Sequence, residues 1–169
     1  MVLIALIGYG AFFSGIFSGS RAASTFEECI ALGNPVMESY PRQCRDGKGN
    51  HVTEVIGNEL EKSDLIRMET PRPNGAVGSP LTIRGEARGY WYFEASFPVV
   101  LIDEAGSVLA EYYATAQDEW MTESFVPFET MLTFAQQPAG SRGTLILKKD
   151  NPSGLSEHDD ELRVPVVFE

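Results

Sequence analysis

The order of apolar and polar residues divides the chain into three regions. Residues 1–20 form a nearly continuous apolar run without a charged side chain. Residues 24–62 are mixed in character, and from residue 63 onward apolar residues alternate with polar ones or gather in short runs. A period of two is typical of β-strands, whose successive side chains point to opposite faces of a sheet. The pattern predicts an apolar helix, a small mixed module and a strand-rich domain.

The region 63–169 is predicted to be mainly β. Turn-forming residues separate about eight short candidate strands, and no convincing helix interrupts them. Short strands joined by tight turns indicate an antiparallel β-sandwich. The candidate strands are residues 65–69, 81–87, 90–96, 99–103, 108–114, 125–134, 144–149 and 162–168.

The apolar run at residues 1–20 is long enough to cross a membrane, because twenty helical residues span about 30 Å. Two interpretations remain open for residues 1–23: a signal anchor, which the length of the run favours, or a signal peptide cleaved near residues 20–23. A buried core helix is a third. No Lys or Arg precedes the run, so we infer that the true start lies upstream of Met1 or that the sequence is clipped.

Residues 24–62 are predicted to be a small α+β module with its linker. Thr25 and Glu28 fit a capping box at the start of a short helix. Cys29 and Cys44 are the only cysteines, and outside the cytoplasm they should pair. A loop of about 15 residues closed in this way gains roughly 3 kcal/mol, which so small a module needs. Two free thiols or a redox-active pair remain the alternative.

The stretch Phe26–Cys44 is similar to a short cysteine-paired module of bacterial envelope proteins, which implies a location but no chemistry. A second set of motifs lies at Ser79–Gly85, Trp91–Val99, Glu119–Phe128, Gly143–Leu147 and Val164–Phe168. With these motifs, residues 63–169 resemble the immunoglobulin-like domain of bacterial spore-germination proteins. The resemblance implies an extracytoplasmic immunoglobulin-like β-sandwich without known enzymatic activity. It does not imply sporulation.

The charge of the chain narrows the possible partners. A net charge of −11 argues against nucleic acid as a ligand, because phosphate binding requires Lys and Arg. It also argues against a basic patch on anionic lipid. Two cysteines are too few for a thiolate zinc cage, and the sequence has no P-loop, dinucleotide-binding or zinc-protease motif. We expect no metal and no cofactor.

Carboxylates are the candidates for catalysis and for Ca²⁺ binding. Glu94 with Asp118 or Glu119 could hydrolyse a wall glycan, but each could instead be a structural carboxylate that accepts backbone N–H bonds. Asp150 with one of residues 159–160 could bind Ca²⁺. The spacing does not fit an EF-hand, and a hydrated loop is the alternative.

Aromatic residues offer a possible binding surface. If residues 90–96 form a strand, Tyr90 and Tyr92 lie on one face, and Trp91 and Phe93 on the other. One face should belong to the core, and the other could be exposed. The candidate surface residues are Tyr90, Tyr92, Glu94, Tyr112 and Trp120.

These observations predict a non-enzymatic binding or scaffolding module outside the cytoplasm. It would be anchored to the cytoplasmic membrane through residues 1–20, or secreted if that segment is cleaved. The expected partner is an envelope protein or peptidoglycan. The alternatives are a carboxylate-based wall hydrolase and a Ca²⁺-stabilised surface adhesin.

Overall fold

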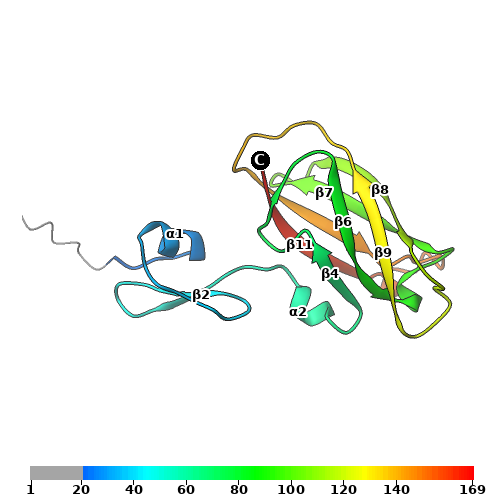
Figure 1. Ribbon diagram of the computed structural model, residues 1–169, viewed down its shortest axis with the longest axis horizontal. Helices are drawn as coiled ribbons and strands as arrows, with labels where there is room; N and C mark the ends of the chain where they lie inside the picture. The colour runs from blue at the N-terminus through cyan, green and yellow to red at the C-terminus, as the bar shows by residue number, and fades with distance from the viewer. Residues whose placement is uncertain (1–20) are drawn as a thin grey trace, which may run out of the picture. The chain divides into compact units, whose positions relative to one another are not determined.

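The computed structural model describes residues 21–169, so the predicted membrane segment lies outside the described residues (Figure 1). The described part comprises two compact units, with the boundary between Glu54 and Val55. None of the helices within residues 21–169 is long and apolar enough to cross a membrane. The membrane assignment of residues 1–20 stays a prediction.

The smaller unit contains one helix and a three-stranded antiparallel sheet. The N-terminus of the helix is capped by the predicted box, because Thr25 Oγ1 accepts a 3.1 Å hydrogen bond from the Glu28 N–H. The Glu28 carboxylate in turn accepts a 2.8 Å bond from the Ser24 N–H. The elements, in sheet order β1-β2-β3, are α1 (Phe26–Ala31), β1 (Val36–Met37), β2 (Gln43–Arg45) and β3 (His51–Thr53).

A disulfide forms the centre of the smaller unit. Cys29 of α1 and Cys44 of β2 are bonded, with their Cα atoms 6.1 Å apart, which confirms the predicted pairing. Both cysteines are fully buried, and Phe26 packs against them. The bond closes a loop across 15 positions, for which chain entropy gives roughly 3 kcal/mol.

The turn between β2 and β3 is organised by Asp46. Its carboxylate accepts hydrogen bonds from the Asn50 side chain at 2.9 Å, from the backbone N–H groups of Asn50 and Lys48 at 2.8 and 2.9 Å, and from Ala23 N–H at 3.1 Å. These donors, with the Asn50 side chain foremost, lower the pKa of Asp46 to about 2. The carboxylate thereby joins the start of the unit to its last hairpin.

The larger unit is built on one eight-stranded sheet in the order β4-β6-β9-β8-β7-β10-β11-β5. Every neighbouring pair is antiparallel except β11 and β5, which run parallel. The elements are α2 (Glu59–Lys62), β4 (Ile66–Thr70), β5 (Ala76–Val77), β6 (Leu81–Arg88), the 3₁₀ turn η1 (Gly89–Trp91), β7 (Ser96–Asp103), β8 (Val108–Ala116), β9 (Phe125–Leu132), β10 (Arg142–Lys148), the 3₁₀ turn η2 (Ser156–His158) and β11 (Glu161–Phe168).

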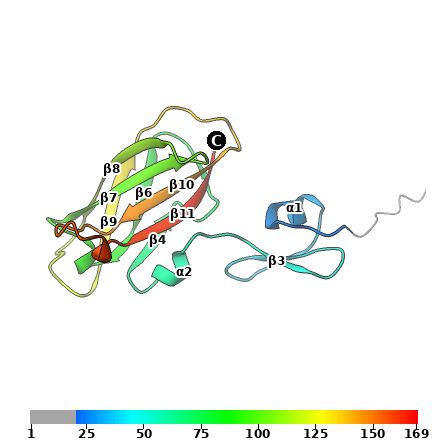
Figure 2. The same ribbon diagram turned by 180° about the vertical axis from the view of Figure 1, so that it is seen from behind.

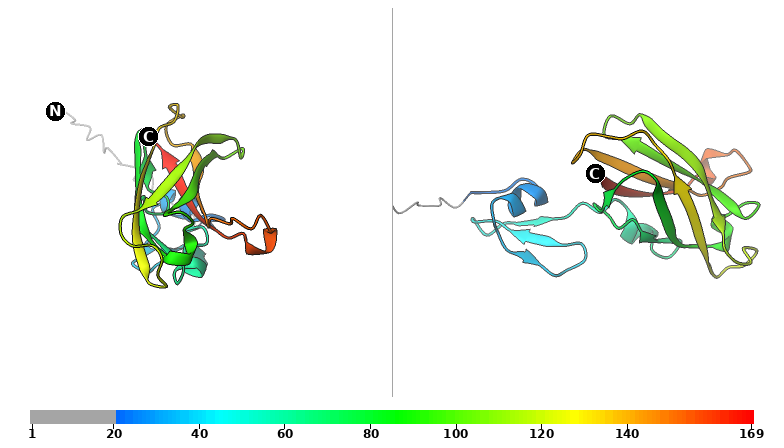
Figure 3. Two further views of the ribbon diagram at one scale, coloured as in Figure 1. Left: turned by 90° about the vertical axis from the view of Figure 1, so that its right-hand side faces the viewer. Right: turned by 45° about the horizontal axis from the view of Figure 1, so that its top comes forward.

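The eight strands form two layers because the sheet folds over between β8 and β9. Strand β8 pairs with β7 along its length, but with β9 only at Thr115 and Ala116. Residues 108–114 of β8 do not pair with β9. As a result, β4, β6 and β9 lie across from β7, β10 and β11 (Figures 2 and 3). The predicted mainly-β sandwich is therefore confirmed.

Apolar side chains from both layers fill the space between them. Ile83 and Phe128 come from the first layer, and Leu101, Leu145 and Val164 come from the second, all with 2% exposure or less. The predicted alternation along β9 is present, with every second side chain buried from position 126 to 132. This burial supplies the main stabilisation of the unit.

Residues 55–62 belong with the larger unit. The Asn58 side chain donates a 2.9 Å bond to the Glu161 carbonyl and accepts a 2.7 Å bond from the Arg163 N–H. Gly57 has a φ of +73°, and a Cβ on it would lie 1.9 Å from the Arg163 carbonyl oxygen. Only glycine therefore fits where this segment meets β11.

The predicted strand at residues 90–96 is wrong. The chain forms the 3₁₀ turn η1 there, followed by a tight hairpin turn between Phe93 and Ser96. Strand β5 was not predicted, because two residues are too few to show a period.

Candidate functional site

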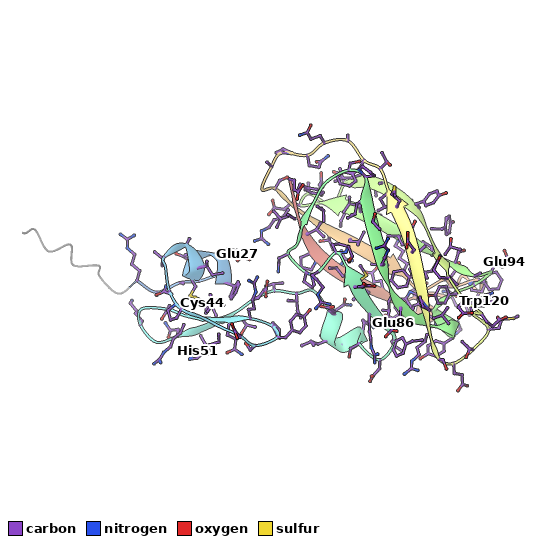
Figure 4. The ribbon with its side chains drawn as sticks, in the orientation of Figure 1. Glu27, Cys44, His51, Glu86, Glu94 and Trp120 are labelled. Atoms are coloured by element: carbon purple, nitrogen blue, oxygen red, sulfur yellow. A yellow bond between two sulfur atoms is a disulfide. The ribbon has the colours of Figure 1, made fainter. Side chains whose placement is uncertain are left out.

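Three loops meet at one end of the larger unit. Residues 89–95, 117–124 and 149–160 connect strand ends that lie side by side in the sheet. The end of β6 pairs with the start of β9, the start of β7 pairs with the end of β8, and the end of β10 pairs with the starts of β7 and β11. Glu94 and Trp120 mark this end in Figure 4. We call it the loop end, and it contains most of the predicted surface residues.

The first two loops are in direct backbone contact. The Gly89 N–H donates a 3.1 Å hydrogen bond to the Ser124 carbonyl. A Cβ atom on Gly89 would lie 1.9 Å from the Thr122 carbonyl oxygen and 2.2 Å from that of Trp120. Such distances are far below van der Waals contact, so the absence of a side chain at position 89 permits this packing.

Buried aromatic residues fix the first loop to the core. The Tyr92 hydroxyl donates a 2.7 Å bond to the Val126 carbonyl, and its ring lies edge-on to Phe97 at 5.2 Å. Burial raises the pKa of Tyr92, so the hydroxyl keeps the proton that it donates. Trp91 is fully buried, and its carbonyl accepts a 3.0 Å bond from the Asp150 N–H. The third loop is thereby attached as well.

Apolar side chains are exposed on this rigid base. Tyr90 is 50% exposed, Phe93 is 41% exposed and Met121 is 74% exposed, while Trp120 is half-buried against the core. We call these four residues the loop-end surface. Apolar side chains that gather at one place on rigid backbone are typical of a binding surface.

A strained turn presents Glu94 next to this surface. Glu94 and Ala95 have φ values of 50° and 63°, in the left-handed region. The turn is closed by hydrogen bonds between Phe93 and Ser96 at 3.0 and 3.1 Å. Two left-handed residues in such a turn are typical of type I′ hairpins, where Asn-Gly is preferred. Each non-glycine residue there costs about 1–2 kcal/mol.

A family model described as the immunoglobulin-like domain of bacterial spore germination matches residues 65–156. The chain belongs to this family. A search of curated proteins and a search of solved structures each found no match. The match begins at β4 and ends in the third loop, and β11 completes the immunoglobulin-like domain beyond it. The family is not a known enzyme family.

The immunoglobulin-like domain brings together three of the predicted surface residues. Tyr90 lies in η1 at the loop end, and Figure 4 shows Glu94 and Trp120 at the same end, whereas Tyr112 is 61% exposed in the middle of β8. Tyr92 is wrong as a surface residue, because it is buried and bonded to β9. The η1 turn replaces the alternation on which its placement depended.

The sequence did not indicate that Phe93 and Met121 are exposed. Phe93 was assigned to the face opposite Tyr90, but the turn leaves both side chains exposed. Met121 lies in a loop without periodicity, so no sequence pattern indicated its exposure. A Met among polar residues between two predicted strands was the only available signal.

The candidate catalytic carboxylates of the second loop stabilise its local fold. Asp118 Oδ1 accepts a 2.7 Å bond from the Glu119 N–H. Glu119 Oε1 accepts a 3.0 Å bond from the Met121 N–H. Both carboxylates thus have the structural role that is the alternative to catalysis. In the third loop, burial is the main influence on the pKa of Asp150 and raises it. A hydrogen bond with the Asn151 backbone lowers this pKa, and the nearby charge of Glu94 raises it.

The candidate Ca²⁺ ligands have protein partners. Asp159 Oδ1 accepts a 2.7 Å bond from the Asn151 side chain, and Asp160 forms a 2.5 Å ion pair with Lys62 of α2. Within the part of the chain that the structure describes, no group of three or more His, Cys, Asp or Glu side chains is arranged to hold a metal. The third loop is thus ordered by contacts within the domain.

A Ser–His contact in the third loop has a local role. Ser153 Oγ lies 2.5 Å from Asn151 Oδ1 and 3.1 Å from His158 Nδ1. Because the amide oxygen can only accept, the hydroxyl proton is directed to Asn151. The hydroxyl is therefore not aligned for activation by the imidazole, and the three side chains close an exposed loop.

Proposed function

We propose that this protein is a non-enzymatic binding module of the bacterial cell envelope. Residues 1–20 hold it on the outer face of the cytoplasmic membrane, and the immunoglobulin-like domain binds an envelope protein through its loop end. The family, the disulfide and the apolar N-terminal run support an extracytoplasmic location.

The loop-end surface carries the proposal. Its backbone is fixed by Gly89, Tyr92 and Asp150, so little conformational entropy is lost when the exposed side chains are covered. Aromatic and Met side chains are enriched in protein interfaces, where a few of them supply most of the binding energy. A protein is therefore favoured over peptidoglycan as the partner.

Cross-linking in intact cells, followed by mass spectrometry, tests this proposal. The test variant replaces Tyr90 and Met121 with Ser, and the matched control replaces Tyr112 and Met131, which are 61% and 56% exposed outside the loop end. We expect a reproducible protein partner with the wild type and the control, and at least a tenfold loss of it in the test variant. Equal recovery with both variants would exclude the loop end as the binding surface.

Two further outcomes would replace the proposal. Glycan fragments in place of a protein would make peptidoglycan the ligand. Activity of the wild type on purified peptidoglycan, lost in Glu94→Gln, would establish the carboxylate hydrolase instead.

Protease digestion of spheroplasts tests the location, because an extracytoplasmic chain is degraded without lysis.

A further inference from the structure

The smaller unit exposes more large apolar side chains than it buries. Its core consists of Phe26 and the disulfide. Val52 is half-buried against this core, and five further large apolar side chains lie outside it, with exposures between 37% and 49%. These residues, which we call the module surface, are Ile30, Leu32, Val36, Met37 and Tyr40. Five exposed residues of this kind are many for so small a unit, and Ile30 and Val36, which lie beside the disulfide, carry the argument.

The module surface adjoins the small core. In α1, Ile30 is four positions after the buried Phe26, so the two side chains lie on the same side of the helix. Val36 is the register partner of the buried Cys44, so both side chains lie on one face of the sheet. Ile30 and Val36 therefore flank the disulfide and extend its apolar environment to the surface of the unit.

Charge is distributed unevenly between the two units. Residues 21–54 contain four Lys or Arg and five Asp or Glu, whereas residues 55–169 contain nine and nineteen. Within the smaller unit, Arg42 and Glu54 form a 2.5 Å ion pair. The smaller unit is thus nearly neutral and can approach anionic lipid headgroups, which repel the acidic domain.

The smaller unit directly follows the predicted membrane segment in the chain. Only residues 21 and 22 separate the apolar run from Ala23, whose N–H is bonded to Asp46 within the unit. An extended chain of this length spans less than about 10 Å. If residues 1–20 cross the membrane, the smaller unit must lie within the headgroup region or directly beside it.

We propose that the smaller unit lies on the outer surface of the cytoplasmic membrane, with the module surface inserted among the lipid headgroups. This inference rests on the membrane anchor of the proposed function. Apolar side chains with an aromatic ring and flanking Arg residues suit this region of a bilayer, where Tyr40 and Arg42 can each keep a polar end in water.

Photolabelling from the lipid tests the inference on the full chain. The protein is reconstituted, one copy per nanodisc, in phosphatidylethanolamine and phosphatidylglycerol, with a phospholipid that carries a diazirine near its glycerol backbone. We expect at least fivefold more label in residues 26–40 than in residues 108–132, which contain Val108 and Met131 as exposed apolar controls. Equal labelling of the two segments would overturn the inference.

Variants show whether the module surface is responsible for the labelling of residues 26–40. Replacing Ile30 and Val36 with Ser should reduce the label on residues 26–40 at least threefold, and replacing Val108 and Met131 with Ser should not. Tyr40→Ser, which leaves the core intact, should give a smaller loss. Recovery of the linked Cys29–Cys44 peptide shows that the unit is still folded. Unchanged labelling in the first and third variants would overturn the inference.

The two proposals fail in different ways. A chain that stays in the nanodisc but leaves residues 26–40 unlabelled retains its anchor and refutes only the contact of the smaller unit with lipid. A chain that leaves the nanodisc refutes the anchor, and the inference with it.

Discussion

The Tyr92 hydroxyl donates a 2.7 Å hydrogen bond to the Val126 carbonyl, although the residues are 34 positions apart in the chain. Val126 lies near the start of β9, and both residues are buried. The bond attaches the first loop of the loop end to the strand that follows the second. The geometry of the proposed binding surface therefore depends on a residue that is not part of it.

Replacing Tyr92 with Phe should destabilise the domain by about 1 kcal/mol, because a buried hydrogen bond is lost while the ring packing is retained. Urea unfolding of the wild type and variant measures the difference. A difference below about 0.3 kcal/mol would show that water or another donor replaces the hydroxyl.

The buried hydrogen bond between Tyr92 and Val126 predicts that the domain loses stability at alkaline pH. Burial raises the pKa of Tyr92 above its ordinary value of about 10, so the folded state retains a proton that the unfolded state releases. The contribution of Tyr92 is complete below pH of about 10 and is lost as the pH rises above it. The stability difference between wild type and Tyr92→Phe should shrink above this pH in urea titrations. A constant difference would contradict the burial.

Gly89→Ala should displace the loop end and destabilise the domain by several kcal/mol, since the new Cβ would lie 1.9 Å from the Thr122 carbonyl oxygen. Gly78→Ala is the matched control, because its Cβ would meet nothing closer than 3.5 Å. Thermal unfolding compares the two. If both variants melt within a degree of the wild type, the loops do not pack as closely as described.

Replacing Glu94 and Ala95 with Asn and Gly should stabilise the domain by about 1 kcal/mol. Both positions have positive φ, which Asn and Gly adopt at lower cost. The control double variant replaces Glu104 and Ala105, in the turn before Gly106, with the same pair, and these positions do not have positive φ. Denaturant midpoints measure the effect, and a gain at the control turn alone would refute the strained geometry.

Acid should loosen the smaller unit. The hydrogen bonds to Asp46 lower its pKa to about 2, so its contribution is complete above the ordinary value of 3.8 and is lost as the pH falls toward 2. The protection factors of the α1 amides, which take the intrinsic pH dependence of hydrogen exchange into account, should fall over this range. Asp46→Asn should be less protected at neutral pH and lack this dependence. Asp103→Asn, in a turn of the larger unit, should leave α1 unchanged.

Local sequence signals predicted the elements that depend on neighbouring residues. Thr25 and Glu28 indicated the start of α1, because a capping box is completed within four positions. The alternation along β9 indicated its buried face, because that face is set by the period of the strand. The cysteine pair followed from having only two candidates.

The candidate site was only partly predictable. Tyr90, Glu94 and Trp120 were selected for their chemistry, and the structure places all three at the loop end. Tyr92 was misplaced because its environment is decided by the contact of Gly89 with the second loop. No periodic pattern encodes a contact between two irregular segments.

The sequence alone determined the disulfide, the mainly-β class and the family resemblance, because each follows from composition, local periodicity or motifs. Only the tertiary structure decided that β8 pairs with β9 at Thr115 and Ala116 alone and that three loops meet at one end. It also decided which aromatic residues are exposed. These features depend on packing between residues that are distant along the chain, where the free energy of burial outweighs local preference.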